Sequence, residues 1–453
     1  MRRSTWVASW IVAASIGAMA AYAQSRGPSA AVFFENARLI AGDATAANEL
    51  SAFIVQNGAF VAVGKQGELT APPGAARVDL AGKSVMPGMI DVHTHLGYRK
   101  GATFSVENYS RDNVVDQLNR LAFYGVAAVA SAGTDRGTVT FRLRDLPPLH
   151  GALVRTAGRG LAPPDAGPAP PMRDAPYGVS TEEEARTDVR ELAAQKVDFV
   201  KIWVDDRNGT VRKLSPVLYR AIIDEAHKHN LRVFAHIATL ADAKDLLRSG
   251  VDGFLHPVRD RDVDDELLGL LKERPKVFFA LTLFAPRLGL YATRPRWLDE
   301  SLRGRSGSND EVARLGEFVA SRKPEAIAAA REEWTRLARN VARLQAAGVP
   351  IALGTDVGGA SAGGLFGWAE HVELENMVAA GLTPAQAIAA ATSTSAAVLG
   401  LDRLGSVAAG KNADFIVLDR SPLQDISNTR RIARVYIRGQ EVRRGPGTLP
   451  SGR

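Results

Sequence analysis

Between residues 89 and 399 the chain alternates short apolar runs with longer amphipathic segments. The apolar runs predict buried strands, and the segments between most of them carry apolar residues at helical spacing. We expect strands at 89–93, 126–131, 152–157, 198–204, 232–237, 253–256, 277–283 and 350–355. We expect helices at 110–123, 181–195, 215–229, 240–248, 263–273 and 325–346, followed by Ala-rich helices at 368–380 and 384–399. This alternation is typical of a parallel sheet covered by helices.

Eight strands joined by crossovers match an α/β fold of the (β/α)8 TIM-barrel type, whose active sites lie at the carboxyl ends of the strands. A doubly wound open sheet gives similar alternation, so the pattern leaves that alternative open. Residues 158–178 are rich in Pro, Gly and Ala, and residues 285–310 are rich in Arg and Gly. Neither segment has the pattern of a strand or helix that would continue the strand–helix alternation. Because both follow strand ends, both are candidate loops over the barrel mouth, with a surface insertion as the alternative.

Both ends of the chain predict short strands separated by Gly and Asn turns. Strands are expected at 31–34, 52–56, 60–63 and 77–80, and again at 413–418 and 434–438. Neither group is long enough to bury a core alone. We therefore expect residues 24–84 and 402–453 to form one composite β-sandwich domain. The TIM-barrel catalytic domain would then span residues 85–401.

The first 23 residues have the composition of a signal peptide. Arg2 and Arg3 are followed by an apolar run over 6–20 and by the small residues of Ala21-Tyr22-Ala23. A membrane anchor is the alternative, but the run is short for a membrane span. We expect residues 1–23 to be removed on export, leaving a periplasmic or secreted protein with no membrane attachment.

Composition narrows the possible chemistry. The chain of 453 residues is 46% hydrophobic and 23% charged, as in globular proteins, and has no cysteine. Thiolate metal sites and cysteine nucleophiles are therefore excluded. The net charge of +7 falls by two on loss of Arg2 and Arg3, and no block of Lys and Arg is present. This argues against a nucleic-acid partner and is compatible with an anionic small molecule.

The strand at 89–93 carries the first candidate metal ligands. His93 and His95 lie two residues apart where this strand ends, so both imidazoles point to the same face. Two converging neutral imidazoles suit a divalent cation. A pair of half-buried polar histidines is the alternative for this motif by itself. The rest of the chain decides between them.

Four further polar residues lie in or after apolar strands: Lys201, His236, His256 and Asp356. Lys201 stands among Phe, Val, Ile and Trp, where burial of an ammonium is costly and lowers the lysine pKa. A neutral amine can take up CO₂ and become an anionic carbamate. Taken singly, each residue has an ordinary structural explanation, such as an outward lysine or a helix N-cap. Taken together, they would meet at one barrel mouth.

These residues stand in motifs that together resemble the amidohydrolase superfamily of metal-dependent hydrolases. The resemblance covers nearly all of the chain after the signal peptide. It includes PGMIDVHTH, FVKIW, FAHI, GFLHP, LGTD and the tail from AGLTPAQAIAAATSTSAAVLGL to LGSVAAGKNADFIVLD. Within the superfamily, the chain is most similar to the branch of Xaa-Pro dipeptidases and imidazolonepropionase-like proteins. In this superfamily the tail returns to the β-sandwich, which agrees with pairing the two ends.

The resemblance implies a role for each residue. His93, His95 and Asp356 would hold one divalent ion, and His236 and His256 a second. Lys201, as its CO₂-derived carbamate, would bridge the two ions. An all-nitrogen and oxygen ligand set suits zinc, and Mn, Co, Fe or Ni would fit too. Asp356 and Lys201 would be the catalytic residues, with Asp356 moving the proton. The presence of every ligand argues against metal-free relatives and against the mononuclear deaminases, which lack the bridging lysine.

The expected substrate is a dipeptide or an N-acyl amino acid. Cations around the predicted mouth could bind its carboxylate; the mouth candidates are Tyr98, Arg99, Lys100, Trp203, Asp205, Arg207 and Arg259. Hydrolysis of a cyclic amide, lactone or xenobiotic ester is an alternative. So is a non-catalytic periplasmic metal- or ligand-binding protein. A homo-oligomer is compatible with the sequence. His371, among Glu370, Glu373 and Glu375, is expected at the surface of its helix.

Overall fold

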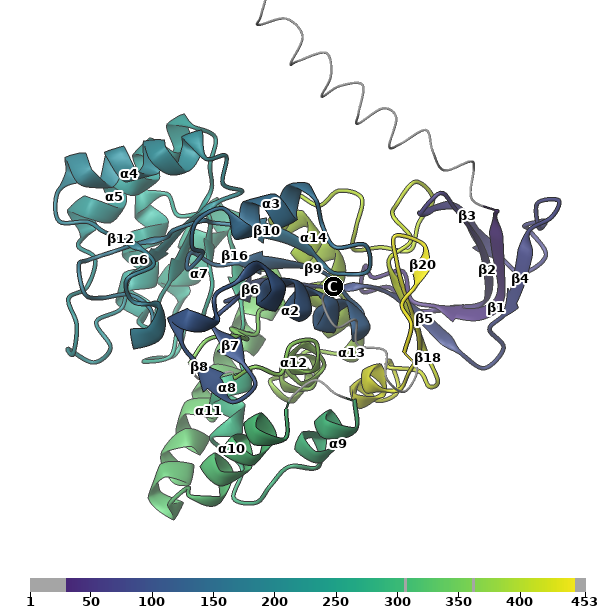
Figure 1. The fold of residues 1–453 in the computed structure, drawn as a ribbon. Helices are drawn as coiled ribbons and strands as arrows, with labels where there is room; N and C mark the ends of the chain where they lie inside the picture. Colours follow the sequence, from purple (N-terminus) through teal and green to yellow (C-terminus); the bar gives the residue numbers. More distant parts are fainter. Residues whose placement is uncertain (1–29, 305–307, 361–362, 445–453) are drawn as a thin grey trace, which may run out of the picture.

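The computed structural model describes residues 30–304, 308–360 and 363–444 (Figure 1). The expected signal peptide, residues 1–23, lies outside this part of the chain. Among the described residues, no helix combines the length and the apolar character that a membrane crossing needs.

The predicted central strands are present, and they run parallel. A three-stranded sheet has the order β10-β9-β6, and a seven-stranded sheet has the order β12-β11-β13-β14-β15-β16-β17. The strands are β6 (Met89–Thr94), β9 (Val126–Ser131), β10 (Leu153–Thr156), β11 (Leu161–Ala162), β12 (Tyr177–Gly178), β13 (Val200–Trp203), β14 (Val233–His236), β15 (Gly253–Phe254), β16 (Phe278–Ala280) and β17 (Ile351–Ala352). These strands are buried along almost their whole length, which explains why they appear in the sequence as continuous apolar runs.

Backbone hydrogen bonds connect the two parallel sheets at both edges. Val92 N donates to Leu353 O at 2.9 Å beside β17, and Asp356 N donates to His93 O at 2.8 Å. On the other side Asp198 N donates to Thr156 O at 2.9 Å. The parallel strands and covering helices form a TIM-barrel-like α/β fold. The regular hydrogen bonding between neighbouring strands is not continuous from one of the two sheets to the other.

All the predicted helices are present, and the short helix α3 (Val139–Asp145) is an addition to them. Thr181 and Thr383 each form a capping box that starts a helix, α4 and α13. The helices are α2 (Arg111–Phe123), α3 (Val139–Asp145), α4 (Glu182–Ala194), α5 (Pro216–Lys228), α6 (Leu240–Ser249), α7 (Asp265–Glu273), α11 (Pro324–Ala346), α12 (Trp368–Ala379), α13 (Pro384–Ala389) and α14 (Ser395–Leu399). A π-helical turn, η3 (Ala390–Thr394), joins the last two, so the predicted helix 384–399 is widened at its centre.

The expectation of an irregular loop over 285–310 is wrong. The chain there forms α8 (Phe284–Leu288), α9 (Arg296–Gly304) and the start of α10 (Asn309–Ala320). Trp297 and Leu298 are buried, and the ring of Trp297 lies 5.6 Å from that of Phe284. A few buried apolar side chains therefore stabilise these helices, although the many Arg and Gly residues of the segment do not indicate a helix.

The segment 158–178 has little regular structure, as predicted. It contains only β11, β12 and a short 3₁₀ turn, η2 (Pro170–Met172). Arg207 holds it in place, since its Nε and Nη2 donate to Gly167 O at 3.0 and 2.6 Å.

Strands from both ends of the chain form one eight-stranded sheet, as the purple and yellow arrows of Figure 1 show. Its order is β20-β19-β18-β5-β1-β2-β3, with β4 also paired to β1. The strands are β1 (Val32–Leu39), β2 (Asn48–Gln56), β3 (Ala59–Lys65), β4 (Ala76–Asp79), β5 (Ser84–Pro87), β18 (Phe415–Leu418), β19 (Ile432–Ile437) and β20 (Gln440–Glu441). Two shorter strands, β7 (Arg99–Lys100) and β8 (Thr103–Phe104), make a separate hairpin.

Aromatic rings show that this sheet folds over on itself. Three strand spacings separate β18 from β2, about 14 Å in a flat sheet. The ring centroids of Phe415 on β18 and Phe53 on β2 are nevertheless 5.3 Å apart, and Phe60 lies 5.5 Å from Phe415. The two halves of the sheet therefore face each other across an aromatic core.

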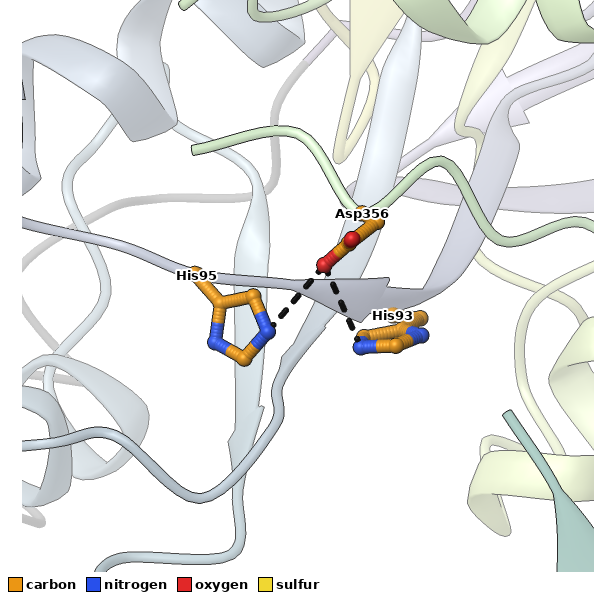
Figure 2. A group of neighbouring side chains, drawn as sticks. All are labelled: His93, His95 and Asp356. Carbon is orange, nitrogen blue, oxygen red and sulfur yellow. Dashed lines mark ion pairs between the residues drawn. The ribbon is translucent and has the colours of Figure 1, made fainter. Parts of the chain in front are cut away.

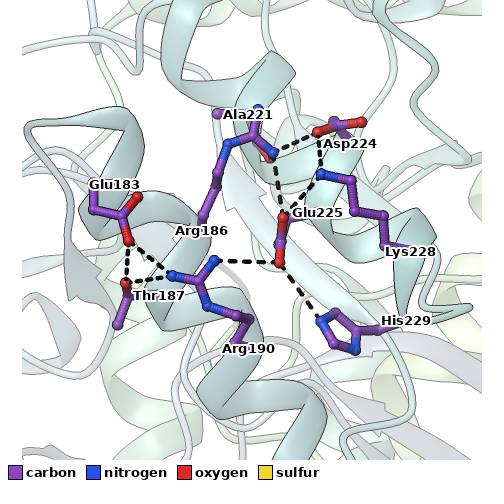
Figure 3. A network of polar contacts seen from close by, with 9 residues as sticks. All are labelled: Glu183, Arg186, Thr187, Arg190, Ala221, Asp224, Glu225, Lys228 and His229. Atoms are coloured by element: carbon purple, nitrogen blue, oxygen red, sulfur yellow. Dashed lines mark hydrogen bonds and ion pairs between the residues drawn. The ribbon is translucent and has the colours of Figure 1, made fainter.

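A network of charged residues joins neighbouring helices on the outside of the fold (Figure 3). Glu225 of α5 is 6% exposed and lies at its centre. Its carboxylate contacts Arg186 and Arg190 of α4 at 3.3 and 3.4 Å, and Lys228 at 3.2 Å. Because several cations share this buried carboxylate, the network fixes α4 and α5 relative to each other.

Candidate metal centre

The six predicted ligands come from five strands of the barrel-like sheet. His93 lies in β6 with His95 just after it, Lys201 lies in β13, and His236 ends β14. The other two, His256 and Asp356, follow β15 and β17. Since the carboxyl ends of parallel strands share one edge, the topology brings these side chains to the same end of the sheet.

Three of the six form a compact group that could hold a metal ion: His93, His95 and Asp356 (Figure 2). The Oδ1 atom of Asp356 lies 3.5 Å from His93 Nε2 and 3.2 Å from His95 Nε2. Ligand atoms around a tetrahedral zinc ion are about 3.4 Å apart, given bond lengths near 2.1 Å. Asp356 adopts a left-handed backbone conformation with φ 60°, which aspartate tolerates.

The proton on His93 can be placed from its surroundings. Its Nδ1 lies 2.9 Å from the carbonyl oxygen of Leu255, which can only accept, so Nδ1 carries the hydrogen. The Nε2 lone pair then faces the carboxylate of Asp356 with no hydrogen between them. Nε2 is buried and has no hydrogen-bond partner among the described residues. A cation between the two acceptors removes this conflict, so the residues fit a metal ion.

Lys201 is fully buried, and its Nζ has no hydrogen-bond partner in the described part of the chain. Burial lowers its pKa from 10.5 to about 7, while the charge of Asp356 opposes this shift. The charge of Lys201 in turn contributes to lowering the pKa of His93, His236 and His256. The amine therefore lies within electrostatic range of both predicted metal positions.

His236 and His256 lie together beside this group, with ring centroids 4.2 Å apart, and the ring of His256 is 4.8 Å from that of His93. His236 Nε2 donates to Asp205 Oδ2 at 3.0 Å, which leaves Nδ1 unprotonated and available to a metal. Burial lowers the pKa of His236 to about 4. These two imidazoles are neutral at neutral pH, as metal ligands must be. The compact group of three does not include them.

A cavity of about 120 Å³ opens onto these residues. Several predicted mouth residues line it, namely Trp203, Asp205, Arg207 and Arg259. Pro168, Ala169 and Met172 of the segment 158–178 line it too, so this segment covers the mouth as expected.

The prediction that Arg99 and Lys100 face the same mouth is wrong. They line a separate cavity of about 580 Å³ beside α2. Arg99 Nη2 donates to the carbonyl oxygens of Gly359 and Ala360 at 2.9 and 3.0 Å. The hairpin β7–β8 turns the chain away from the metal centre directly after Tyr98, whose hydroxyl donates to Thr134 O.

His371 also differs from its prediction. It is fully buried on α12, where its Nε2 donates to Tyr124 O at 2.9 Å. Burial lowers its pKa to about 3. The acidic neighbours Glu370 and Glu373 are buried as well, because α12 packs on several sides. The polar sequence of this helix therefore gave a false indication of exposure.

Buried polar residues orient several of the ligands. Asp91 accepts hydrogen bonds from His93 N at 2.9 Å and from Thr355 Oγ1 at 2.5 Å. It thus ties β6 to the residue before Asp356. Thr134 and Thr282 contact Nδ1 of His95 and His256 at 2.9 and 2.8 Å. No local motif marks either threonine.

Replacing Thr355 by valine is expected to weaken the metal centre without altering a ligand. The substitution preserves shape but leaves Asp91 Oδ2 without its hydroxyl donor, a loss of about 1–3 kcal/mol in unfolding free energy. Partners that orient metal ligands typically contribute about 10–100-fold in metal affinity. Chelator competition and denaturant unfolding measure the two effects. Thr355→Ser, which keeps the hydroxyl, is the control; equal weakening in both variants would contradict this role for the hydroxyl.

The fold and the geometry of the predicted ligands together are those of an α/β protein of the metal-dependent hydrolase class. Residues 84–442 match the amidohydrolase family, and the chain belongs to this family. The predicted resemblance is therefore confirmed. Members of the family are hydrolases that typically bind divalent metal ions.

Individual relatives differ in their reactions. The chain is 26% identical to ochratoxinase of Aspergillus niger over 81% of this chain and 77% of the relative. It is 26% identical to a 5-methylthioadenosine/S-adenosylhomocysteine deaminase of Halalkalibacterium halodurans over 76% of this chain and 74% of the relative. A solved structure of a proposed prolidase from Bifidobacterium longum is 27% identical, with a TM-score of 0.73, over 93% of this chain and 96% of that chain.

Proposed function

We propose that this chain is an exported, binuclear amidohydrolase that cleaves the amide bond of a dipeptide or an N-acyl amino acid. One observation carries the proposal. The amine of Lys201 is fully buried, has no hydrogen-bond partner among the described residues and is coupled electrostatically to three imidazoles and Asp356. An unpaired buried amine is costly, so its retention in this place needs a chemical reason.

Carbamate formation supplies that reason. With a pKa of about 7, much of the Lys201 amine is neutral at neutral pH. Nζ adds to the carbon of CO₂ and loses one proton to water, which leaves an anionic carbamate. His93, His95 and Asp356 would hold one ion and His236 and His256 another, and the carbamate of Lys201 would supply both with an anionic oxygen ligand. Nitrogen and oxygen ligands suit zinc.

Two divalent cations would lower the pKa of a bound water and polarise the carbonyl group under attack. Asp356 is placed to take the proton from the attacking water and to pass it to the departing amine. Burial by itself would raise the pKa of Asp356, but His93 and His95 lower it below the usual range, so the group is an ionised carboxylate at neutral pH. Trp203 and Met172 add apolar side chains to the lining of the cavity.

Two guanidinium groups support a substrate with a free carboxylate. Arg207 and Arg259 both line the cavity, and arginine pairs with carboxylates through parallel hydrogen bonds. Arg207 already donates twice to Gly167 O, whereas Arg259 Nε has no hydrogen-bond partner among the described residues. A dipeptide or an N-acyl amino acid would place its carboxylate here and its amide carbonyl at the ions.

Three structural proposals accompany this function. Residues 1–23 would direct export to the periplasm or the medium. The hydrogen bonds that link β6 to the residues after β17 support a closed barrel of eight strands. The folded sheet of the two chain ends would be the composite β-sandwich domain.

Assay of a panel of dipeptides and N-acyl amino acids with zinc-loaded protein tests the proposal. We expect turnover of members with a free carboxylate and a strong loss for their C-terminal amides. Cleavage of lactones, cyclic amides or esters without amide turnover would favour the ring-opening or ester-hydrolase alternative. Ligand binding with no turnover of any class would favour the binding-protein alternative.

A further inference from the structure

Arg259 makes a contact that bears on metal binding by His256. Its Nη2 lies 3.0 Å from His256 Nδ1. A guanidinium can only donate, so Nδ1 must accept in this arrangement. A neutral imidazole with an unprotonated Nδ1 carries its hydrogen on Nε2. His256 held by Arg259 therefore cannot offer Nε2 to a metal ion.

A second partner of the same nitrogen permits the opposite tautomer. Thr282 Oγ1 lies 2.8 Å from His256 Nδ1 and, unlike Arg259, can accept a hydrogen bond. Thr282 has φ 44°, a rare conformation for a β-branched residue. Such strain is typically retained where the placement of the side chain matters. With Nδ1–H donating to Thr282, Nε2 becomes free to bind a metal ion.

We propose that Arg259 is a positioning residue that governs the tautomer of His256, so that metal binding at His256 and the Arg259–His256 hydrogen bond exclude each other. Metal loading releases the guanidinium into the cavity, where a substrate carboxylate can take it. This inference rests on the metal centre of the proposed function and is independent of the bond that is cleaved.

The surroundings of Arg259 support a guanidinium that can leave His256. Its Nε is buried without a hydrogen-bond partner among the described residues, so the group is not fixed by a bidentate pair. Burial and the charge of Arg207 lower the pKa of Arg259, and the nearby carboxylates of Glu333, Asp356 and Asp205 oppose this shift. Reciprocity then follows from linkage: a carboxylate that binds Arg259 makes metal binding at His256 easier.

Nitrogen-15 NMR of the imidazoles in metal-free protein tests this inference, with zinc affinity as a second measurement. We expect His256 to carry its hydrogen on Nε2 in the native chain and on Nδ1 in Arg259→Met. Zinc should bind about tenfold tighter, or more, at the weaker of the two sites of Arg259→Met, since a hydrogen bond to a charged group no longer has to break.

Arg207→Met is the matched control, because it removes a cation from the same cavity without touching His256. It should leave the His256 tautomer unchanged. The inference is overturned if His256 already carries its hydrogen on Nδ1 in the native protein, or if both variants tighten zinc binding equally through charge alone. Neither measurement requires turnover, so an inactive protein would refute the proposed reaction and leave this result standing.

Discussion

Replacing Lys201 by methionine is expected to make the metal-free protein more stable and to prevent it from binding a full complement of metal. The native amine is 0% exposed and has no hydrogen-bond partner among the described residues. Methionine fills similar space without a polar group that must be desolvated. We expect a gain of about 3 kcal/mol in the free energy of unfolding at neutral pH, measured by denaturant titration after chelation in CO₂-free buffer.

The size of this gain should depend on pH in one direction. The pKa of Lys201 is about 7 in the folded chain, against an ordinary value of 10.5. Between these values the unfolded chain binds the proton and the folded chain does not, so native stability rises with pH. Below pH 7 both states are protonated and the full cost of burial remains. The advantage of the variant should therefore shrink as pH rises from about 7 toward 10.5.

Metal content provides the complementary result. The native chain in bicarbonate buffer is expected to bind two zinc ions, whereas Lys201→Met lacks the bridging group and should keep at most one. Lys201→Arg is a useful control, since it retains a cation but cannot form a carbamate at neutral pH. Full zinc content in either variant, or native loading that is indifferent to bicarbonate, would contradict the bridging carbamate.

The success of the sequence in placing the barrel elements has a local cause. Buried parallel strands such as 126–131 are apolar at every position but the last, Ser131, and caps such as Thr181 mark where helices begin. Strand ends are less well predicted. The segment 277–283 forms a strand only at Phe278–Ala280, because the left-handed Thr282 turns the chain at the mouth. Thr282, which ends the strand early, also contacts His256 of the candidate metal centre.

In the candidate site, too, the sequence predicts some residues and not others. His93 and His95 could be paired from the two-residue period of a strand alone. Contacts such as Thr282 with His256, and Thr355 with Asp91, depend on the register of strands that are distant in the sequence. The sequence does not predict the position of Arg99, because a hairpin that begins directly after Tyr98 directs this residue to another cavity. Proximity to a strand end therefore identifies ligand candidates but not the partners that orient them.

Replacing Asp356 by asparagine is expected to lower kcat by about 10²–10⁴-fold, the usual contribution of a group that transfers a proton. The amide has nearly the same shape and keeps one oxygen that can face His93 and His95. It cannot accept a proton in the relevant pH range. KM for the best substrate of the panel should change much less than kcat, and steady-state kinetics of zinc-loaded protein measure both.

Asp414→Asn is the matched control, because this carboxylate is also buried but lies at the start of β18, where it accepts a hydrogen bond from Arg438 N. It should leave kcat unchanged. A chain that only binds its ligand would show neither turnover nor a difference between the two variants. Loss of kcat in Asp356→Asn with unchanged zinc content isolates proton transfer from metal binding. If zinc is lost together with kcat, Asp356 acts chiefly as a ligand, and the proton must travel through another group of the cavity.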